Sequence, residues 1–404
     1  MGLHKLIFVT CLMLVASVIS QKASYDNYKV YRIIPTSGEQ LAALKKLQDF
    51  NDNYSYWREP SIVNRSADLM VGPTKQSEFA DLMNLVGIKY ETYVDNVQRL
   101  VDEERSTVLE SPKEFGWENY YDLEEIYAWL KSLAAKYPKQ VEVVVGGKTF
   151  QGRQIKGIKL SFGGNRSAVF IEGGIHAREW ITPATVTYLI NEFLTSKQPE
   201  IRKLAEAYDW YMFPSDRLWR KTLSDRGYGC KGADPNRNFD YKWMTTGASS
   251  DPCSETYAGS EAFSEIETKT LSKYIESISK KLFAYISFHS YSQLLMFPYG
   301  HTSEHLDNYE ESLSMGRKAV EALAKKYGTQ YDTGNIAETI YETSGVSMDW
   351  AKGTLKLPVT FTYELRDTGE YGFILPADQI IPNCEEVVDS LIALFEEARR
   401  LGYP

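Results

Sequence analysis

The chain has 404 residues, a formal net charge of −9 and a pI near 5.3. With 43% hydrophobic and 25% charged residues it is globular in composition, and its length suits one large domain with a smaller one. An acidic surface attracts neither nucleic acid nor an anionic membrane, so both are excluded as partners.

The first 20 residues are expected to be a secretory signal peptide. Lys5 precedes an apolar run from Leu6 to Ile19, and Ser20 is the small residue that a signal peptidase needs. The run is too short to span a membrane, and the alternative is a buried N-terminal helix. We therefore expect an extracellular protein.

Export changes what the four cysteines indicate. Cys11 leaves with the signal peptide, and two of the other three can pair in an oxidising compartment. Cys230 and Cys253 flank a loop-like stretch and are predicted to form the disulfide, which leaves Cys384 as a buried free thiol. Acceptor triplets for N-glycosylation fit the same route and lie at Asn53, Asn64 and Asn165.

Residues 21–105 are predicted to be a small α+β domain. Alternating and helical patterns indicate strands near 28–34, 54–57, 67–71 and 90–97, and helices that begin at Ser37 and Gln76. The charged stretch from Arg99 to Arg105 is typical of an exposed, cleavable linker, although the same charges fit the solvated face of a helix.

Residues 106–404 are predicted to be an α/β domain. A helix is expected between Asp122 and Pro138, another from Thr182, and a closing one over 385–401. Strands are expected at 141–145, 155–162, 168–172, 209–213, 282–288 and 358–365. Buried strands that alternate with helices predict a mixed, mostly parallel sheet with helices on both faces.

Two of the five histidines follow apolar strands, where ligand sites of open α/β sheets collect. His176 comes after a Gly-Gly turn with Glu179 three residues later, and His289 follows the 282–288 strand. Two imidazoles and one carboxylate are the ligand set of a catalytic zinc. The His-x-x-Glu triplet alone is weak evidence, because most such triplets are surface pairs.

Five sequence blocks strengthen this interpretation: 176–180 (HAREW), 218–222 (LWRKT), 235–238 (PNRN), 288–292 (FHSYS) and 363–369 (YELRDTG). Together, and in this order, they resemble the signature blocks of the carboxypeptidase A/B family of zinc exopeptidases. The resemblance covers about residues 110–404, and the 21–105 domain is similar to that family's activation segment.

The resemblance implies one Zn²⁺ per chain, with the ligands His176, Glu179 and His289. It assigns Glu364 as the general base and later acid, and Arg220 as the group that polarises the scissile carbonyl. A structural salt bridge between Glu364 and Arg366 is the alternative for that carboxylate.

The resemblance also implies how a peptide is bound. Residues similar to those that bind a free α-carboxylate or line the same site are Arg178, Asn236, Arg237, Ser290, Tyr291 and Tyr341. The wall of the specificity pocket would be Met296, Ile336, Ile340, Thr343, Met348 and Thr362. Met348 stands where the basic-specific branch carries an acidic residue, so an apolar or aromatic C-terminal residue should be preferred.

One departure from the family bears on activity. A segment of roughly a dozen residues or more, with an Asn-Pro-Asp-Gly-Tyr turn, is missing before Arg217. We expect this short connection to draw Arg220 away from the carbonyl and to impair catalysis.

Three functions remain open. The first is a digestive-type precursor, a monomer activated by a trypsin-like protease at Arg105 and acting on the C-termini of peptides or proteins. The second is a secreted, catalytically impaired binding protein on the same fold. The third is an unrelated lectin-like module.

Overall fold

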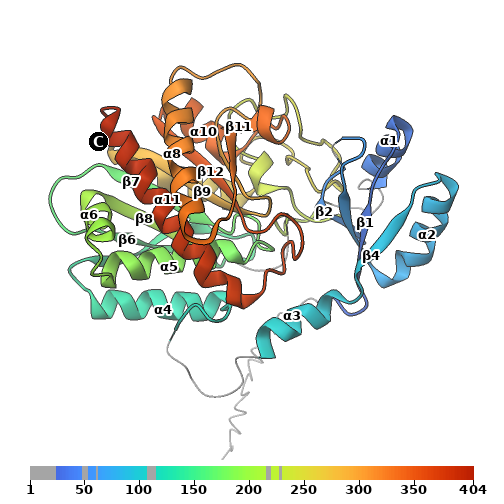
Figure 1. Ribbon diagram of the computed structural model, residues 1–404, viewed down its shortest axis with the longest axis horizontal. Helices are drawn as coiled ribbons and strands as arrows, with labels where there is room; N and C mark the ends of the chain where they lie inside the picture. Colours follow the sequence, from blue (N-terminus) through green and yellow to red (C-terminus); the bar gives the residue numbers. More distant parts are fainter. Residues whose placement is uncertain (1–23, 48–52, 61, 107–114, 215–219, 227–229) are drawn as a thin grey trace, which may run out of the picture.

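A computed structural model describes residues 24–47, 53–60, 62–106, 115–214, 220–226 and 230–404. The expected signal peptide and residues 215–219, where we expect the missing segment, lie outside the described residues. Figure 1 shows a small N-terminal domain beside a larger one, with helix α3 beneath the small domain.

The small domain is a four-stranded antiparallel sheet in the order β2-β3-β1-β4, with two helices packed on it (Figure 1). Its core includes Tyr31, Leu44, Phe79 and Met83. The α+β prediction is confirmed. The elements are β1 (Lys29–Ile33), α1 (Gly38–Lys46), β2 (Tyr54–Arg58), β3 (Ala67–Val71), α2 (Gln76–Leu85) and β4 (Tyr90–Val94).

The charged stretch that follows is helical. Helix α3 (Val97–Ser106) buries Val97 and Val101, which lie four residues apart and so share one face. The alternative of a solvated helix face is therefore confirmed for this stretch. Cleavage at Arg105 stays a prediction.

The large domain contains an eight-stranded mixed sheet in the order β11-β10-β12-β9-β7-β8-β6-β5. The pairs β11–β10, β12–β9, β9–β7 and β7–β8 are parallel, and the other three are antiparallel. The predicted mixed, mostly parallel sheet is confirmed. The strands are β5 (Val141–Lys148), β6 (Gln154–Leu160), β7 (Ala168–Gly173), β8 (Asp209–Pro214), β9 (Leu282–Ser290), β10 (Leu294–Phe297), β11 (Asp332–Asn335) and β12 (Val359–Leu365).

Helices cover both faces of this sheet (Figure 1). Along β7, Val169 and Ile171 enter the core shared with α4, α5, α6, α8 and α11, whereas Ala168 and Phe170 enter the core shared with α7 and α10. The helices are α4 (Leu123–Lys136), α5 (Ile181–Thr195), α6 (Pro199–Ala207), α7 (Ile266–Ile278), α8 (Tyr309–Tyr327), α9 (Ile336–Thr339), α10 (Ser347–Gly353) and α11 (Ile380–Arg400).

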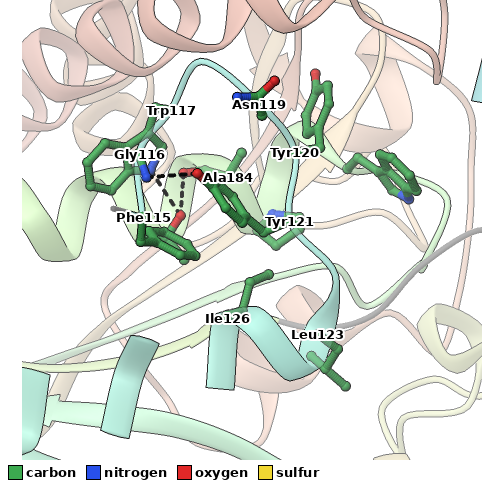
Figure 2. Close-up of a pocket in the computed structure, with 12 residues that line it drawn as sticks. Phe115, Gly116, Trp117, Asn119, Tyr120, Tyr121, Leu123, Ile126 and Ala184 are labelled. Carbon is green, nitrogen blue, oxygen red and sulfur yellow. Dashed lines mark hydrogen bonds between the residues drawn. The ribbon is translucent and has the colours of Figure 1, made fainter. Parts of the chain in front are cut away.

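The chain enters the large domain through an aromatic segment, shown in Figure 2. The Gly116 N–H donates to the Tyr121 hydroxyl (3.1 Å), and the Trp117 indole N–H donates to the Thr187 hydroxyl (3.1 Å). The hollow beside them has a volume of about 20 Å³. That is room for about one water molecule, so this hollow is a packing gap rather than a ligand site.

Candidate active site

Two central strands bring the predicted metal ligands together. The parallel strands β7 and β9 are neighbours, so His176, just after β7, and His289, near the end of β9, reach the same edge of the sheet. The Nδ1 atoms of both rings point to Glu179, at 2.8 Å from Oε1 for His176 and 3.1 Å from Oε2 for His289. One possible ligand atom from each residue lies within 4.8 Å of the others.

This group fits a catalytic zinc in its chemistry as well as its spacing. Two imidazole nitrogens and one carboxylate are the usual protein ligands, and all three side chains are buried. Burial opposes ionisation of Glu179, but the two histidines outweigh it and lower the pKa of that carboxyl. Among the described residues, His176, Glu179 and His289 form the one group of side chains that could hold a metal ion.

A buried carboxylate that the sequence did not reveal supports this group. Asp234 Oδ1 lies 3.0 Å from Nε2 of His176, the ring nitrogen that faces away from Glu179. Burial raises the pKa of Asp234, but the charges of Arg220, His176 and Arg237 hold it well below its usual range. Such outer carboxylates fix the orientation and tautomer of a metal-binding histidine.

Glu364 lies beside the metal ligands on strand β12. It pairs in register with His289 on β9 and lines the same cavity. Burial raises its pKa to about 8, against the lowering effect of His289. The alternative of a salt bridge with Arg366 is wrong, because Arg366 binds Glu386 through Nε and Nη2, each at 2.7 Å.

Arg220 also lines this cavity. Its Nη2 donates to Asp234 Oδ2 (2.5 Å) and its Nε to the Glu255 carbonyl (3.3 Å). Burial opposes the charge on this guanidinium, but Asp234 and Glu59 raise its pKa. Asp234 and Glu255 thus hold the Arg220 guanidinium at the cavity, which argues against a displacement by the short connection. The expected loss of catalysis stays a prediction.

The residues predicted to bind a substrate carboxylate gather nearby. Arg237 Nη2 donates to the Tyr341 hydroxyl (3.4 Å), and Asn236 Oδ1 accepts from the Ser347 N–H (2.9 Å). The buried Ser290 hydroxyl has no hydrogen-bond partner among the described residues. These groups, with Arg178 and Tyr291, line the cavity that contains Glu364.

The predicted specificity residues form one apolar wall of that cavity. Met296, Ile336 and Met348 pack together and are at most 5% exposed. Ile340, Thr343 and Thr362 also line the cavity, whose volume of about 380 Å³ suits a small ligand. Asp332 lines it too, but this carboxylate is exposed to solvent.

The small domain covers the cavity from outside. Trp57 packs edge-on against Phe373, with ring centroids 5.7 Å apart, and Glu59 and Arg65 line the cavity itself. Arg32 donates to the Gly369 carbonyl (2.6 Å) and Arg58 to the Thr368 carbonyl (2.6 Å). Peptide access to the metal site is therefore restricted while this domain stays in place.

The cysteines lie as predicted. Cys230 and Cys253 form a disulfide with a Cα–Cα distance of 5.0 Å. Cys384 is free and buried, and burial raises the pKa of its thiol to about 12. A thiol of this kind is unreactive at neutral pH.

The α/β sheet, the His/Glu/His group and the buried carboxylate at the strand ends define a metallohydrolase under a covering domain. Family descriptions match the chain as "Zinc carboxypeptidase" over residues 126–390 and as "Carboxypeptidase activation peptide" over residues 31–104. The chain belongs to the zinc carboxypeptidases and carries their activation peptide, so it is a metallopeptidase made as a zymogen.

Relatives agree with this assignment. The chain is 46% identical over 400 residues to zinc carboxypeptidase A 1 of Anopheles gambiae (95% of this chain, 92% of the relative). It is 42% identical over 429 positions to zinc carboxypeptidase A 1 of Drosophila melanogaster, with 100% of both covered. Its structure resembles the crystal structure of thrombin activatable fibrinolysis inhibitor, with a TM-score of 0.85, 30% identity and coverage of 93% of this chain and 100% of that one.

The alignment with the Drosophila protein is longer than this chain, 429 positions against 404 residues. That relative therefore contains residues with no counterpart here.

Proposed function

We propose that this zymogen is exported, is activated by a trypsin-like protease, and then acts as a monomer that removes apolar or aromatic residues from peptide C-termini. The observation that carries the proposal is that one cavity contains the His/Glu/His group, Glu364, the arginines and the apolar wall around Met348. No helix in the described part of the chain is long and apolar enough to cross a membrane.

The residues divide the chemistry among them. Bound zinc would act as a Lewis acid on water and on the scissile carbonyl. Glu364 would accept the proton of the attacking water and return it to the leaving amine. Arg220 would stabilise charge on the carbonyl oxygen, and Arg237 with Asn236 and Tyr341 would bind the terminal carboxylate.

The apolar wall would determine which C-terminal residue of the peptide is preferred. The cation of a C-terminal Lys would be buried against Met348 without a counter-charge, which costs several kcal/mol. Asp332 does not offset that cost, because an exposed carboxylate is screened by water.

The test uses trypsin-activated protein and three matched peptides that end in Phe, Leu or Lys. We expect kcat/KM to favour Phe or Leu over Lys by at least ~10-fold. A preference for Lys would overturn the pocket assignment. Full zinc content without turnover would support the impaired binding protein instead.

A further inference from the structure

We propose that the exported chain carries N-linked glycans at Asn64 and Asn165 but none at Asn53, so that activation removes one glycan and leaves the other. The inference rests on the proposed export, because Asn-x-Ser triplets are glycosylated in the secretory pathway. The three triplets are equivalent in sequence, and the fold distinguishes them.

Asn64 is exposed in the loop between β2 and β3. Its N–H donates to the Pro35 carbonyl (2.7 Å), and the next residue, Arg65, donates its N–H to the Ile62 carbonyl (3.3 Å). Its φ of 65° lies in the left-handed region that asparagine tolerates better than most residues. A fixed, exposed turn of this kind accepts a bulky glycan without repacking.

Asn165 is exposed in the turn between β6 and β7. Gly163 and Gly164 precede it with φ of 89° and 87°, so the turn needs glycine there and leaves Asn165 at the surface. His176 follows the other end of β7, about 20 Å away along six strand residues. A glycan on Asn165 therefore does not obstruct the active site.

Asn53 has a different environment. Its side chain is half-buried, and its Oδ1 would lie only 2.7 Å from a Cβ added at Gly72, whose N–H donates to the Asn53 carbonyl (2.8 Å). Two residues on, Ser55 lies between the domains, with its hydroxyl bonded to Glu255 (3.2 Å). A glycan on Nδ2 of this half-buried side chain would have to fit between Gly72 and the edge of this interface, where a bulky group has little room.

The domain in which each glycosylated asparagine lies determines which glycan activation removes. Asn64 belongs to the loop whose Glu59 and Arg65 line the catalytic cavity, so its glycan would stand beside the covered cavity of the precursor. It leaves with the activation domain. The glycan on Asn165 belongs to the catalytic domain and stays.

The test expresses the full chain in insect cells and recovers protein from both medium and cells. Peptide N-glycosidase in ¹⁸O-labelled water marks each glycosylated asparagine, and mass spectrometry reads the three peptides. We expect the label at Asn64 and Asn165 in the precursor and at Asn165 alone after trypsin activation. A label at Asn53, or an unlabelled Asn64 or Asn165 in either fraction, overturns the inference.

Two variants provide an independent readout by gel mobility. Asn64→Asp keeps a residue that tolerates the left-handed turn but removes the acceptor, so the precursor should migrate faster and the activated enzyme should be unchanged. Ser66→Thr keeps the triplet and the hydroxyl that accepts from Arg58 (2.9 Å), so it should match the wild type. An Asn64→Asp precursor with wild-type mobility contradicts the inference.

The peptide assay distinguishes this inference from the proposed function. Protein that is unlabelled at all three sites but trims C-terminal Phe refutes the glycans alone. Labelled protein without turnover supports the glycans and counts against the activity.

Discussion

At the scale of single residues, Glu364 has the most direct consequence. Replacing it with Gln keeps its shape but removes the proton acceptor, so zinc should stay bound while turnover falls by at least ~10²-fold. Metal analysis and kcat measured on the same sample test this, with the exposed Glu310→Gln as the matched control. Near-normal turnover in Glu364→Gln would show that another group is the base.

The same carboxyl predicts a pH dependence. Burial raises the pKa of Glu364 from 4.5 to about 8, and only the ionised form can accept a proton. A nearby zinc cation favours that ionised form and lowers the pKa again. We therefore expect kcat/KM to rise with pH, with a midpoint above 4.5 and below about 8. A kcat/KM that falls as pH rises through this window would contradict the assignment.

A substitution at Asp234 tests whether this carboxylate strengthens metal binding through His176. Asp234→Asn keeps the shape of the side chain but weakens its hydrogen bond to His176 Nε2, so zinc affinity should fall by ~10–100-fold. Competition with a chelator measures this, and the exposed Asp240→Asn should behave as wild type. Equal affinity in all three proteins would mean that Asp234 serves Arg220 alone.

At the scale of elements, the contact between the domains can be tested through Asp68. This fully buried carboxylate of β3 accepts from Arg32 Nε (2.7 Å) and from the Tyr291 hydroxyl (3.4 Å), so it links the activation domain to a residue of the cavity. Asp68→Asn should weaken the cover and raise small-peptide hydrolysis by the uncut precursor at least ~10-fold. The exposed Asp81→Asn on α2 is the control. A precursor that stays fully inactive would place the inhibitory contact elsewhere.

The elements also show how far the sequence could be interpreted. Long segments such as α4 and β9 were predicted, because the buried residues of α4 repeat at helical spacing and β9 is a continuous run of buried residues. The strands β10 and β11 were missed, since each has only four residues and no clear alternation. The charges of α3 left a linker and a helix face equally open, because the two valines that fix its buried face occupy few positions among them.

Some residues of the candidate site could likewise be predicted from the sequence, and others could not. The metal ligands and Glu364 were predictable from motif blocks at strand ends. Asp234 was not, because its contact with His176 joins residues 58 apart and its own neighbours, Pro235 and Asn236, indicate only a turn. Glu59 was missed for a related reason, since its place in the cavity depends on how two domains pack.

At the scale of the whole molecule, the question is whether the shortened chain still supports catalysis. Asp234 and Glu255 hold Arg220 in the cavity, so the loss of an oxyanion donor, roughly 10²–10³ in rate, is not expected. Restoring a family-like turn between Pro214 and Asp216 should leave zinc content unchanged and alter kcat/KM by less than ~10-fold, because Arg220 is already in place.

Arg220→Gln in the unmodified chain sets the scale for this comparison. This substitution should lower kcat/KM on an apolar peptide by ~10²–10³-fold, because it removes the hydrogen-bond donor itself. If restoring the turn instead raises kcat/KM by as much as Arg220→Gln lowers it, the short connection misplaces the arginine after all. The chain as written would then bind zinc as a poor catalyst, which is the impaired binding protein that the sequence left open.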